Sequence, residues 1–144
     1  MLLVHGSCVA LGGRGVLLRG ASGAGKSDLA LRLIDTGARL VADDQVALDR
    51  RGDAVVAHAP EAIAGLIEVR GLGILRLDHL PEAALALVVD LVEPPLERMP
   101  RERTAHLLDV ALPNVSLDPW ELSSASKVRL AMRVATGTIM SPQC

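Results

Sequence analysis

Aromatic side chains are almost absent from this chain of 144 residues, which has no phenylalanine, no tyrosine and a single tryptophan, Trp120. Half of the residues are nevertheless hydrophobic, so the core has to be built from leucine, valine, isoleucine and alanine. Proteins that bind single-stranded nucleic acid stack successive bases on aromatic side chains. The shortage of aromatic residues therefore argues against such a partner.

Strong charge of one sign, a disulfide framework and long apolar runs are missing as well. The formal net charge is −2, so no positive field favours a phosphate backbone, and we expect no nucleic-acid partner. Two cysteines, Cys8 and Cys144, do not make the pattern of a disulfide-rich domain. No apolar run is long enough to span a bilayer, and residues 1–6 do not resemble a signal peptide. We expect one cytoplasmic domain with no membrane partner.

A glycine-rich loop at residues 20–27 is the most informative stretch, because it fits the phosphate-binding pattern G-x-x-x-x-G-K-[ST]. Its glycines let the backbone approach a triphosphate, and its N–H groups present positive partial charge. Lys26 is expected to reach the β- and γ-phosphates, and the Ser27 hydroxyl to bind Mg²⁺. The residues predicted to bind ATP are Gly20, Ala21, Ser22, Gly23, Ala24, Gly25, Lys26 and Ser27.

The elements around this loop predict an α/β fold in a single domain. An apolar strand precedes the loop, and an amphipathic helix that stops before Gly37 follows it. Predicted strands cover residues 2–11, 16–19, 39–44, 46–49, 54–58, 85–92, 107–112 and 115–117. Helices are predicted at 26–36, at 60–67, and from an Asp118 N-cap to Thr136.

Two adjacent carboxylates, Asp43 and Asp44, end the predicted strand that follows the helix. Ligands in open α/β sheets lie beyond the carboxyl ends of the strands. An aspartate there can hold Mg²⁺ or accept a proton from an attacking hydroxyl. Neighbouring strand residues point to opposite faces, so we expect one aspartate to face the metal and substrate and the other to cap a turn. A plain Asp-Asp turn is the alternative.

Three other features have both a structural and a functional interpretation. His5 is either a structural histidine near a strand end or a site residue. The Gly71-Leu72-Gly73 segment is either a structural turn or part of a site. The proline-broken loop of residues 93–103 carries Arg98, Arg101 and Arg103. It is either a solvated connection or the source of an arginine for a transferred phosphoryl group.

Taken together, these segments resemble the catalytic domain of bacterial HPr kinase/phosphorylase. The resemblance is carried by His5-Gly6, by residues 20–27 and 40–44, and by Glu68-Val69-Arg70-Gly71-Leu72-Gly73, which is similar to the family's own signature. It covers nearly the whole chain, which we interpret as one catalytic domain, residues 1–144, in a short form without the family's N-terminal domain. It implies a P-loop-containing domain with a mixed β-sheet and a core similar to phosphoenolpyruvate carboxykinase.

The resemblance also implies a function, that of an ATP- and Mg²⁺-dependent kinase for a serine of HPr, the phosphocarrier of the phosphotransferase system. It implies that Lys26 holds the phosphates, that Ser27 and Glu68 hold Mg²⁺, and that Asp44 is the general base, with Asp43 close behind. His5 matches a histidine beside that aspartate, and Arg98 most resembles the family's catalytic arginine. A homo-hexamer is implied as well.

The segment from Leu117 to Lys127 departs from the family pattern, because it lacks the arginines and glycine that the family links to dephosphorylation. The sequence therefore predicts the kinase and leaves open a reverse reaction, in which phosphate releases pyrophosphate from phosphoserine-HPr. Two alternative functions also stay open. One is a small-molecule kinase with an arginine lid, and the other is a non-catalytic ATP-binding regulatory module.

Overall fold

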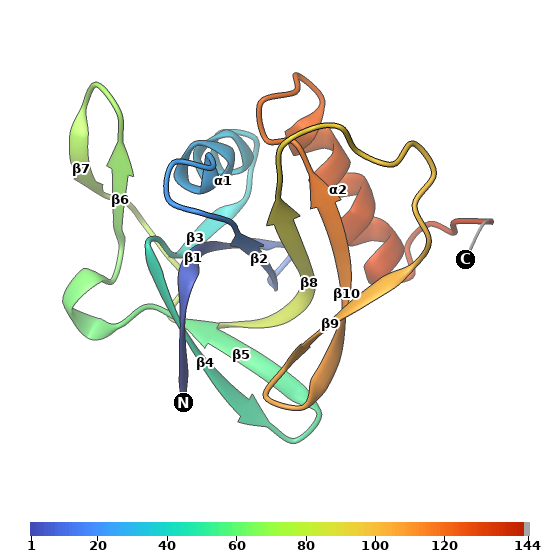
Figure 1. The fold of residues 1–144 in the computed structure, drawn as a ribbon. Helices are drawn as coiled ribbons and strands as arrows, with labels where there is room; N and C mark the ends of the chain where they lie inside the picture. Colours follow the sequence, from blue (N-terminus) through green and yellow to red (C-terminus); the bar gives the residue numbers. More distant parts are fainter. Residues whose placement is uncertain (143–144) are drawn as a thin grey trace.

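Ten strands and two α-helices make up residues 1–142, the part of the chain that the structure, a computed structural model, describes (Figure 1). The strands are β1 (Leu2–Leu11), β2 (Arg14–Arg19), β3 (Arg39–Ala42), β4 (Gln45–Arg51), β5 (Ala54–His58), β6 (Leu66–Val69), β7 (Gly73–Arg76), β8 (Ala83–Leu91), β9 (Arg103–Leu107) and β10 (Val110–Leu117). The helices are α1 (Lys26–Asp35) and α2 (Ser124–Ala135), with one short 3-10 helix, η1 (Glu61–Ile63). None of the helices in this described part has the length and apolar character needed to cross a membrane.

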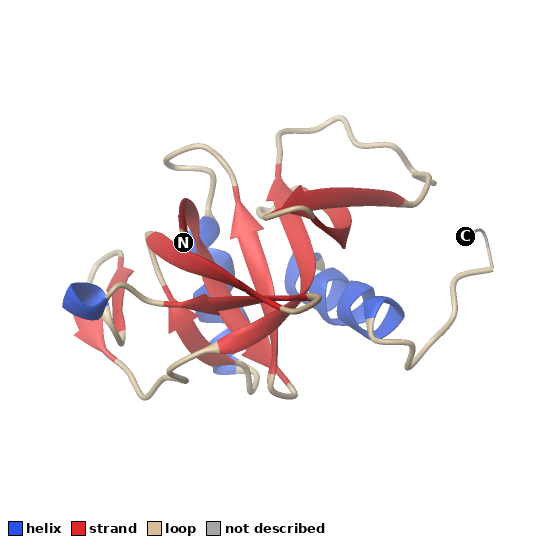
Figure 2. Ribbon diagram, turned by 90° about the horizontal axis from the view of Figure 1, so that it is seen from below, coloured by secondary structure: helices blue, strands red, loops and turns tan. Residues whose placement is uncertain are grey.

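Two sheets share the long strands β1 and β8. One sheet has the order β1-β4-β5-β8, and the other has the order β3-β1-β2-β8-β10-β9. β8 is antiparallel to β5 but parallel to β2 and β10, so the predicted mixed sheet is confirmed. β6 and β7 pair only with each other, as a hairpin at the end of the molecule away from α2 (Figure 2).

Gly6 is the point at which β1 changes partner. β1 pairs with β4 up to His5 and with β2 from Gly6 onward. A Cβ atom on Gly6 would lie 2.7 Å from the carbonyl oxygen of Leu18. Because that oxygen belongs to the backbone, the clash could not be removed by moving a side chain. The glycine of the His5-Gly6 pair is therefore needed for close backbone approach, and it sets His5 at the boundary between the two sheets.

The core has two layers of aliphatic side chains, separated by the larger sheet. On β2, Leu17 faces the smaller sheet, whereas Val16 and Leu18 face the helices, as the alternation of a strand requires. Leu29 on α1 and Val128 on α2 pack into the second layer. Both helices thus cover the same face of the larger sheet, and β4 and β5 lie on the other face (Figure 1).

Cys8 belongs to this core. It is a buried free thiol, and burial raises its pKa to about 12. A thiol that stays protonated is a packing residue and not a nucleophile. The other cysteine, Cys144, lies outside the described residues.

The predicted strands 2–11, 16–19 and 85–92, the hairpin that ends at His58, and the first helix are confirmed within a few residues. Two other predictions were wrong. Residues 60–67 form one 3-10 turn and the start of β6 instead of a helix. The strand predicted at 107–112 contains a turn, because Leu108 and Asp109 both adopt positive φ, 51° and 63°. This turn separates β9 from β10, and β9 begins at Arg103, the last residue of the loop predicted at 93–103.

The start of the last helix was also predicted wrongly, since α2 begins at Ser124. The Asp118 carboxylate accepts a hydrogen bond from the Trp120 N–H at 2.9 Å, as a helix cap would. However, the turn does not continue into a helix, because the Ser124 hydroxyl donates to the Pro119 and Glu121 carbonyls. Residues 119–123 are instead held as a turn against α1.

A polar network joins the three parallel strands β2, β8 and β10 near the point where β2 leads into the glycine-rich loop. The Arg19 guanidinium donates two hydrogen bonds to Asp90, at 2.8 and 3.2 Å, and the Asn114 amide donates a third at 3.0 Å. Burial raises the pKa of Asp90, but these hydrogen bonds and the charges of Arg19 and Arg103 outweigh it, so the pKa lies below its ordinary value. The network ties β2 to β8 and β10.

We expect Asp90→Asn to lower the free energy of unfolding by about 1 kcal/mol near neutral pH, because it removes the charge that the Arg19 guanidinium binds. A carboxylate whose pKa is lower in the folded state stabilises the fold above its unfolded pKa of about 3.9, and this contribution is lost as the pH falls. Urea denaturation at several pH values should show the difference between the two proteins shrink toward about pH 3.

Asp53→Asn, at an exposed position in the β4–β5 turn, serves as the control and should change stability little at any pH. A deficit in Asp90→Asn that did not depend on pH would contradict a charged Asp90–Arg19 pair.

Candidate active site

The glycine-rich loop connects β2 to α1 and is shaped by two glycines with positive φ. Gly23 has φ 79° and Gly25 has φ 97°, and Gly25 is also the N-cap of α1. Only glycine adopts such angles without strain. The loop therefore ends with the free N–H groups of the first turn of α1, where an anion is favoured by the helix dipole.

Lys26 lies over this loop. Its ammonium donates to the carbonyls of Gly20 and Ala21, at 2.6 and 2.9 Å. Burial lowers the pKa of Lys26, and the negative charges of Asp44 and Asp43 act in the opposite direction. A cation with little competing water is thus available to phosphate oxygens at this loop.

Asp43 is the buried carboxylate of the site, with 4% of its surface exposed. One oxygen, Oδ1, accepts hydrogen bonds from the hydroxyls of Ser27, at 2.8 Å, and Ser7, at 2.7 Å. The other oxygen lies 3.4 Å from the backbone nitrogen of Glu68. Asp43 therefore connects the first turn of α1 to β1 and β6, and it orients the Ser27 hydroxyl.

Asp44 lies in a different environment. Its side chain is 74% exposed, and its carboxylate is 3.7 Å from Nδ1 of His5. Its backbone adopts a positive φ of 69°, and its carbonyl accepts a hydrogen bond from the Gly6 N–H at 3.1 Å. The two aspartates thus have different surroundings, and Asp43 is held by two serine hydroxyls instead of capping a turn. That one of them faces a metal and the substrate stays a prediction.

A cavity of about 370 Å³ opens over the loop and brings together residues that are far apart in the sequence. Its walls come from β1, the glycine-rich loop, α1, the turn after β3, β6 and the segment before α2. The lining residues are His5, Ser7, Ser22, Gly23, Gly25, Lys26, Ser27, Asp28, Leu31, Asp44, Glu68, Val69, Arg70 and Trp120.

Most of the residues predicted from the sequence meet in this cavity. His5, Lys26, Ser27, Asp44 and Glu68 line it. Asp43 lies behind Ser27, to which it is bonded. Of the rest of the loop, Ser22, Gly23 and Gly25 also line the cavity, whereas Gly20, Ala21 and Ala24 are not among its lining residues.

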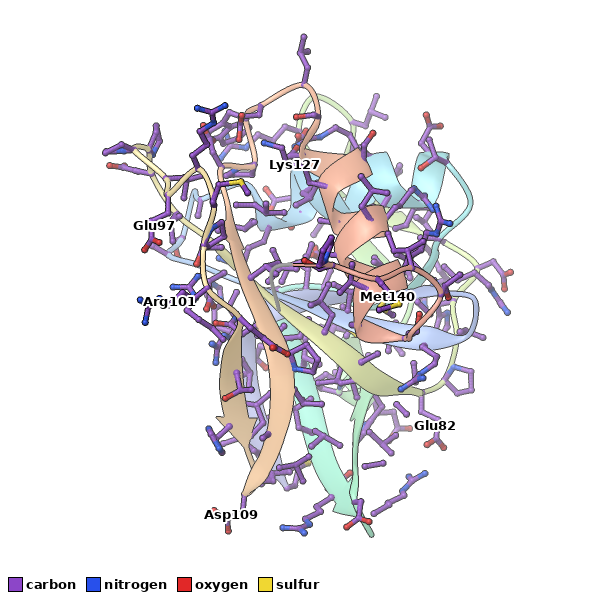
Figure 3. The ribbon with its side chains drawn as sticks, turned by 90° about the vertical axis from the view of Figure 1, so that its right-hand side faces the viewer. Glu82, Glu97, Arg101, Asp109, Lys127 and Met140 are labelled. Carbon is purple, nitrogen blue, oxygen red and sulfur yellow. The ribbon has the colours of Figure 1, made fainter. Side chains whose placement is uncertain are left out.

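Arg98 is the exception, because the structure does not bring it to the cavity. It is exposed on the loop between β8 and β9 and is not among the lining residues. Glu97 and Arg101, on the same loop, lie at the outer edge of the molecule (Figure 3). The arginine that does line the cavity is Arg70, directly after β6.

Several lining residues were not predicted as site residues: Asp28, Leu31 and Val69, and the three whose polar or aromatic groups matter for chemistry, Ser7, Arg70 and Trp120. Ser7 could have been found, since residues i and i+2 of a strand share a face and Ser7 follows His5 by two. Arg70 lies within the Glu68 to Gly73 segment that the sequence pointed to. Nothing in the sequence pointed to Trp120, which reaches the site only because residues 119 and 120 pack against Gly25.

The donor atoms of this site suit Mg²⁺ that is held in part by a nucleotide. No group of three or more His, Cys, Asp or Glu side chains within residues 1–142 is arranged to hold a metal alone. Magnesium in nucleotide sites takes one or two protein ligands, and phosphates and water fill the remaining positions. The Ser27 hydroxyl and the Glu68 carboxylate, both in the cavity, fit that requirement.

Residues 1–121 match the sequence family described as HPr Serine kinase C-terminal domain. The chain belongs to this family. HPr kinase/phosphorylase of Geobacillus thermodenitrificans is 39% identical over 127 residues, which cover 79% of this chain and 41% of that protein. The enzyme of the same name from Bordetella pertussis has the same identity and coverage. The chain thus spans about two fifths of the length of these curated relatives.

A solved structure of the HPr(Ser) kinase/phosphatase from Coxiella burnetii has a similar fold, with a TM-score of 0.84 and 25% sequence identity. The match covers 96% of this chain and 98% of that one. The predicted fold class, an α/β domain with a mixed β-sheet, is confirmed by this match.

We expect Ser7→Ala to destabilise the fold, because it removes one of the two hydroxyl donors to the buried Asp43 carboxylate. A hydrogen bond to a charged group contributes about 1.5–3 kcal/mol, and urea denaturation should show a loss of that size. Ser126→Ala, on an exposed position of α2, is the control and should change stability by less than about 0.5 kcal/mol. Equal stabilities of the two variants would contradict a structural Ser7–Asp43 bond.

Proposed function

We propose that residues 1–144 form the catalytic domain of an ATP-dependent kinase that phosphorylates a serine of an HPr-type phosphocarrier protein. The observation that carries the proposal is the pairing, in one cavity, of a phosphate-binding loop with an exposed carboxylate, Asp44. Relatives named HPr kinase/phosphorylase support HPr as the substrate. A cytoplasmic location and a homo-hexamer belong to the same proposal and rest on resemblance to the family.

The phosphates of ATP are held by the loop N–H groups and by Lys26, whose ammonium exchanges its carbonyl partners for phosphate oxygens. Ser27 and Glu68 would hold Mg²⁺, and Asp43 keeps the Ser27 hydroxyl in place. When bound, Mg²⁺ neutralises negative charge on the phosphate oxygens. Lys26 adds to that effect, so that a carboxylate and a nucleophile can approach the γ-phosphorus.

Asp44 is the general base of this proposal. Its side chain is exposed to the cavity, so a protein serine can reach it, whereas both hydroxyl bonds of Asp43 are made behind the loop. The serine Oγ gives its proton to the Asp44 carboxylate and forms a bond to the γ-phosphorus. The bond from that phosphorus to the β–γ bridging oxygen breaks, and ADP leaves. His5, 3.7 Å away, orients the carboxylate.

Arg70 supplies the additional positive charge near the transferred phosphoryl group. It lines the same cavity as Asp44 and Lys26, whereas Arg98, the arginine that family resemblance favours, does not. Arg101 and Arg103 are also outside the cavity lining, and Arg103 donates to the Ser116 hydroxyl. An arginine lid of the kind that a small-molecule kinase would use is therefore not formed by these three residues over the described cavity.

The first test is intact-mass analysis of HPr after incubation with this chain, ATP and Mg²⁺. We expect a gain of one phosphate on a serine, absent with Lys26→Ala. Asp44→Asn should bind ATP but transfer phosphate about 10² to 10⁴ times more slowly, the usual contribution of a general base. Asp53→Asn, far from the cavity, should behave as the parent chain does.

The result of this test separates the proposal from its alternatives. Phosphate transfer to a metabolite but not to HPr would identify a small-molecule kinase, and ATP binding without any transfer would identify a regulatory module. Adding inorganic phosphate to the phosphorylated product, and assaying pyrophosphate, decides whether the reverse reaction occurs.

The roles of the two arginines can be compared directly in the same assay. We expect Arg70→Ala to lower kcat about 10²-fold, because it removes a cation from the cavity that holds the transferred charge. Arg98→Ala should leave kcat within a factor of two or so. The opposite ranking would return the catalytic role to Arg98.

A further inference from the structure

Trp120, the only aromatic residue of the chain, lies against the phosphate-binding loop. A Cβ atom on Gly25 would be 3.1 Å from the indole Cζ2 and 3.2 Å from Cη2, so the edge of the ring covers that glycine. Trp120 as a whole residue is nevertheless 62% exposed, and it lines the cavity. A large aromatic surface is thus presented to the space next to the phosphate site.

The segment that carries Trp120 is hydrogen-bonded to α1. The Arg32 guanidinium, on α1, donates to the Pro119 carbonyl and, at 2.7 Å, to the Ser124 hydroxyl. The Trp120 N–H donates to Asp118 at 2.9 Å. These contacts hold the backbone on both sides of Trp120 before any ligand binds, so ordering this segment on binding requires little conformational entropy.

The two ends of the cavity differ in chemistry. Asp44, Glu68 and His5, which lie at the reacting end, come from the turn after β3, from β6 and from β1. Trp120 precedes α2, and α2 lies on the other side of α1 from β6 (Figures 1 and 2). A nucleotide that lies across the start of α1 with its terminal phosphate at Asp44 therefore extends its nucleoside toward Trp120.

We propose that Trp120 is the platform on which the base of the bound nucleotide stacks. The inference rests on nucleotide binding at the loop, which is part of the proposed function, and adds to it the subsite for the base. Stacking on an aromatic ring uses the π-face that every base has and contributes about 1–3 kcal/mol per base. The glycine-rich loop by itself recognises only phosphates. The single tryptophan adds an affinity for the nucleoside.

The test compares ATP with inorganic tripolyphosphate, which has the phosphates but no base. We expect the intrinsic fluorescence of Trp120 to be quenched by ATP and not by tripolyphosphate. By calorimetry, Trp120→Ala should raise the Kd for ATP about tenfold and leave the Kd for tripolyphosphate unchanged. Trp120→Phe keeps an aromatic face and should retain most of the affinity for ATP.

The possible outcomes separate this inference from the proposed function. If Trp120→Ala bound ATP as tightly as the parent chain, or lost affinity for tripolyphosphate to the same degree, Trp120 would not be a base platform, and the kinase proposal would stand. If Trp120→Ala bound HPr more weakly but ATP normally, the indole would contact the protein substrate instead. If the parent chain bound neither ligand, the nucleotide site itself would be refuted.

Discussion

The buried carboxylate of Asp43 is the interaction on which the rest of the site depends. It receives the hydroxyls of Ser7 and Ser27 and lies close to the backbone of Glu68. A buried charge is tolerated only when hydrogen bonds replace the water that it has lost, so the residue has to sit where these groups converge. Through these hydrogen bonds Asp43 joins β1, α1 and β6, the elements that carry His5, Lys26, Ser27 and Glu68.

Asp43 and Asp44 have different roles in the site because their surroundings differ. The Asp43 carboxylate accepts hydrogen bonds from the hydroxyls of Ser7 and Ser27, whereas the carboxylate of Asp44, the next residue, is exposed. The positive φ of Asp44 and the hydrogen bond from Gly6 to its carbonyl make this possible. The proposed mechanism and the proposed base platform use one cavity, in which Asp44 and the indole of Trp120 both lie beside the glycine-rich loop.

Sequence patterns anticipated the parts of the molecule that local chemistry controls. The glycine-rich loop, the helix after it, the apolar strands and the hairpin that ends at His58 were all predicted from spacing and composition. Predictions from short sequence patterns were wrong where the same residues are compatible with two local structures. Asp118 makes the capping bond that a helix start needs, yet Ser124 turns the chain before the helix begins. Leu108 and Asp109 lie within a mostly apolar run that predicts a strand, yet they form a turn.

The sequence by itself determined the chemistry of this protein: a phosphate-binding loop, paired aspartates and a core without aromatic side chains, because these depend on residue type and short spacing. Only the tertiary structure decided which arginine, which aspartate and which additional residues share the cavity. Arg70 lines it and Arg98 does not, Asp43 is buried and Asp44 open, and Ser7 and Trp120 join them. These choices depend on how sheets and helices pack residues that are distant in the sequence, and no local pattern records that packing.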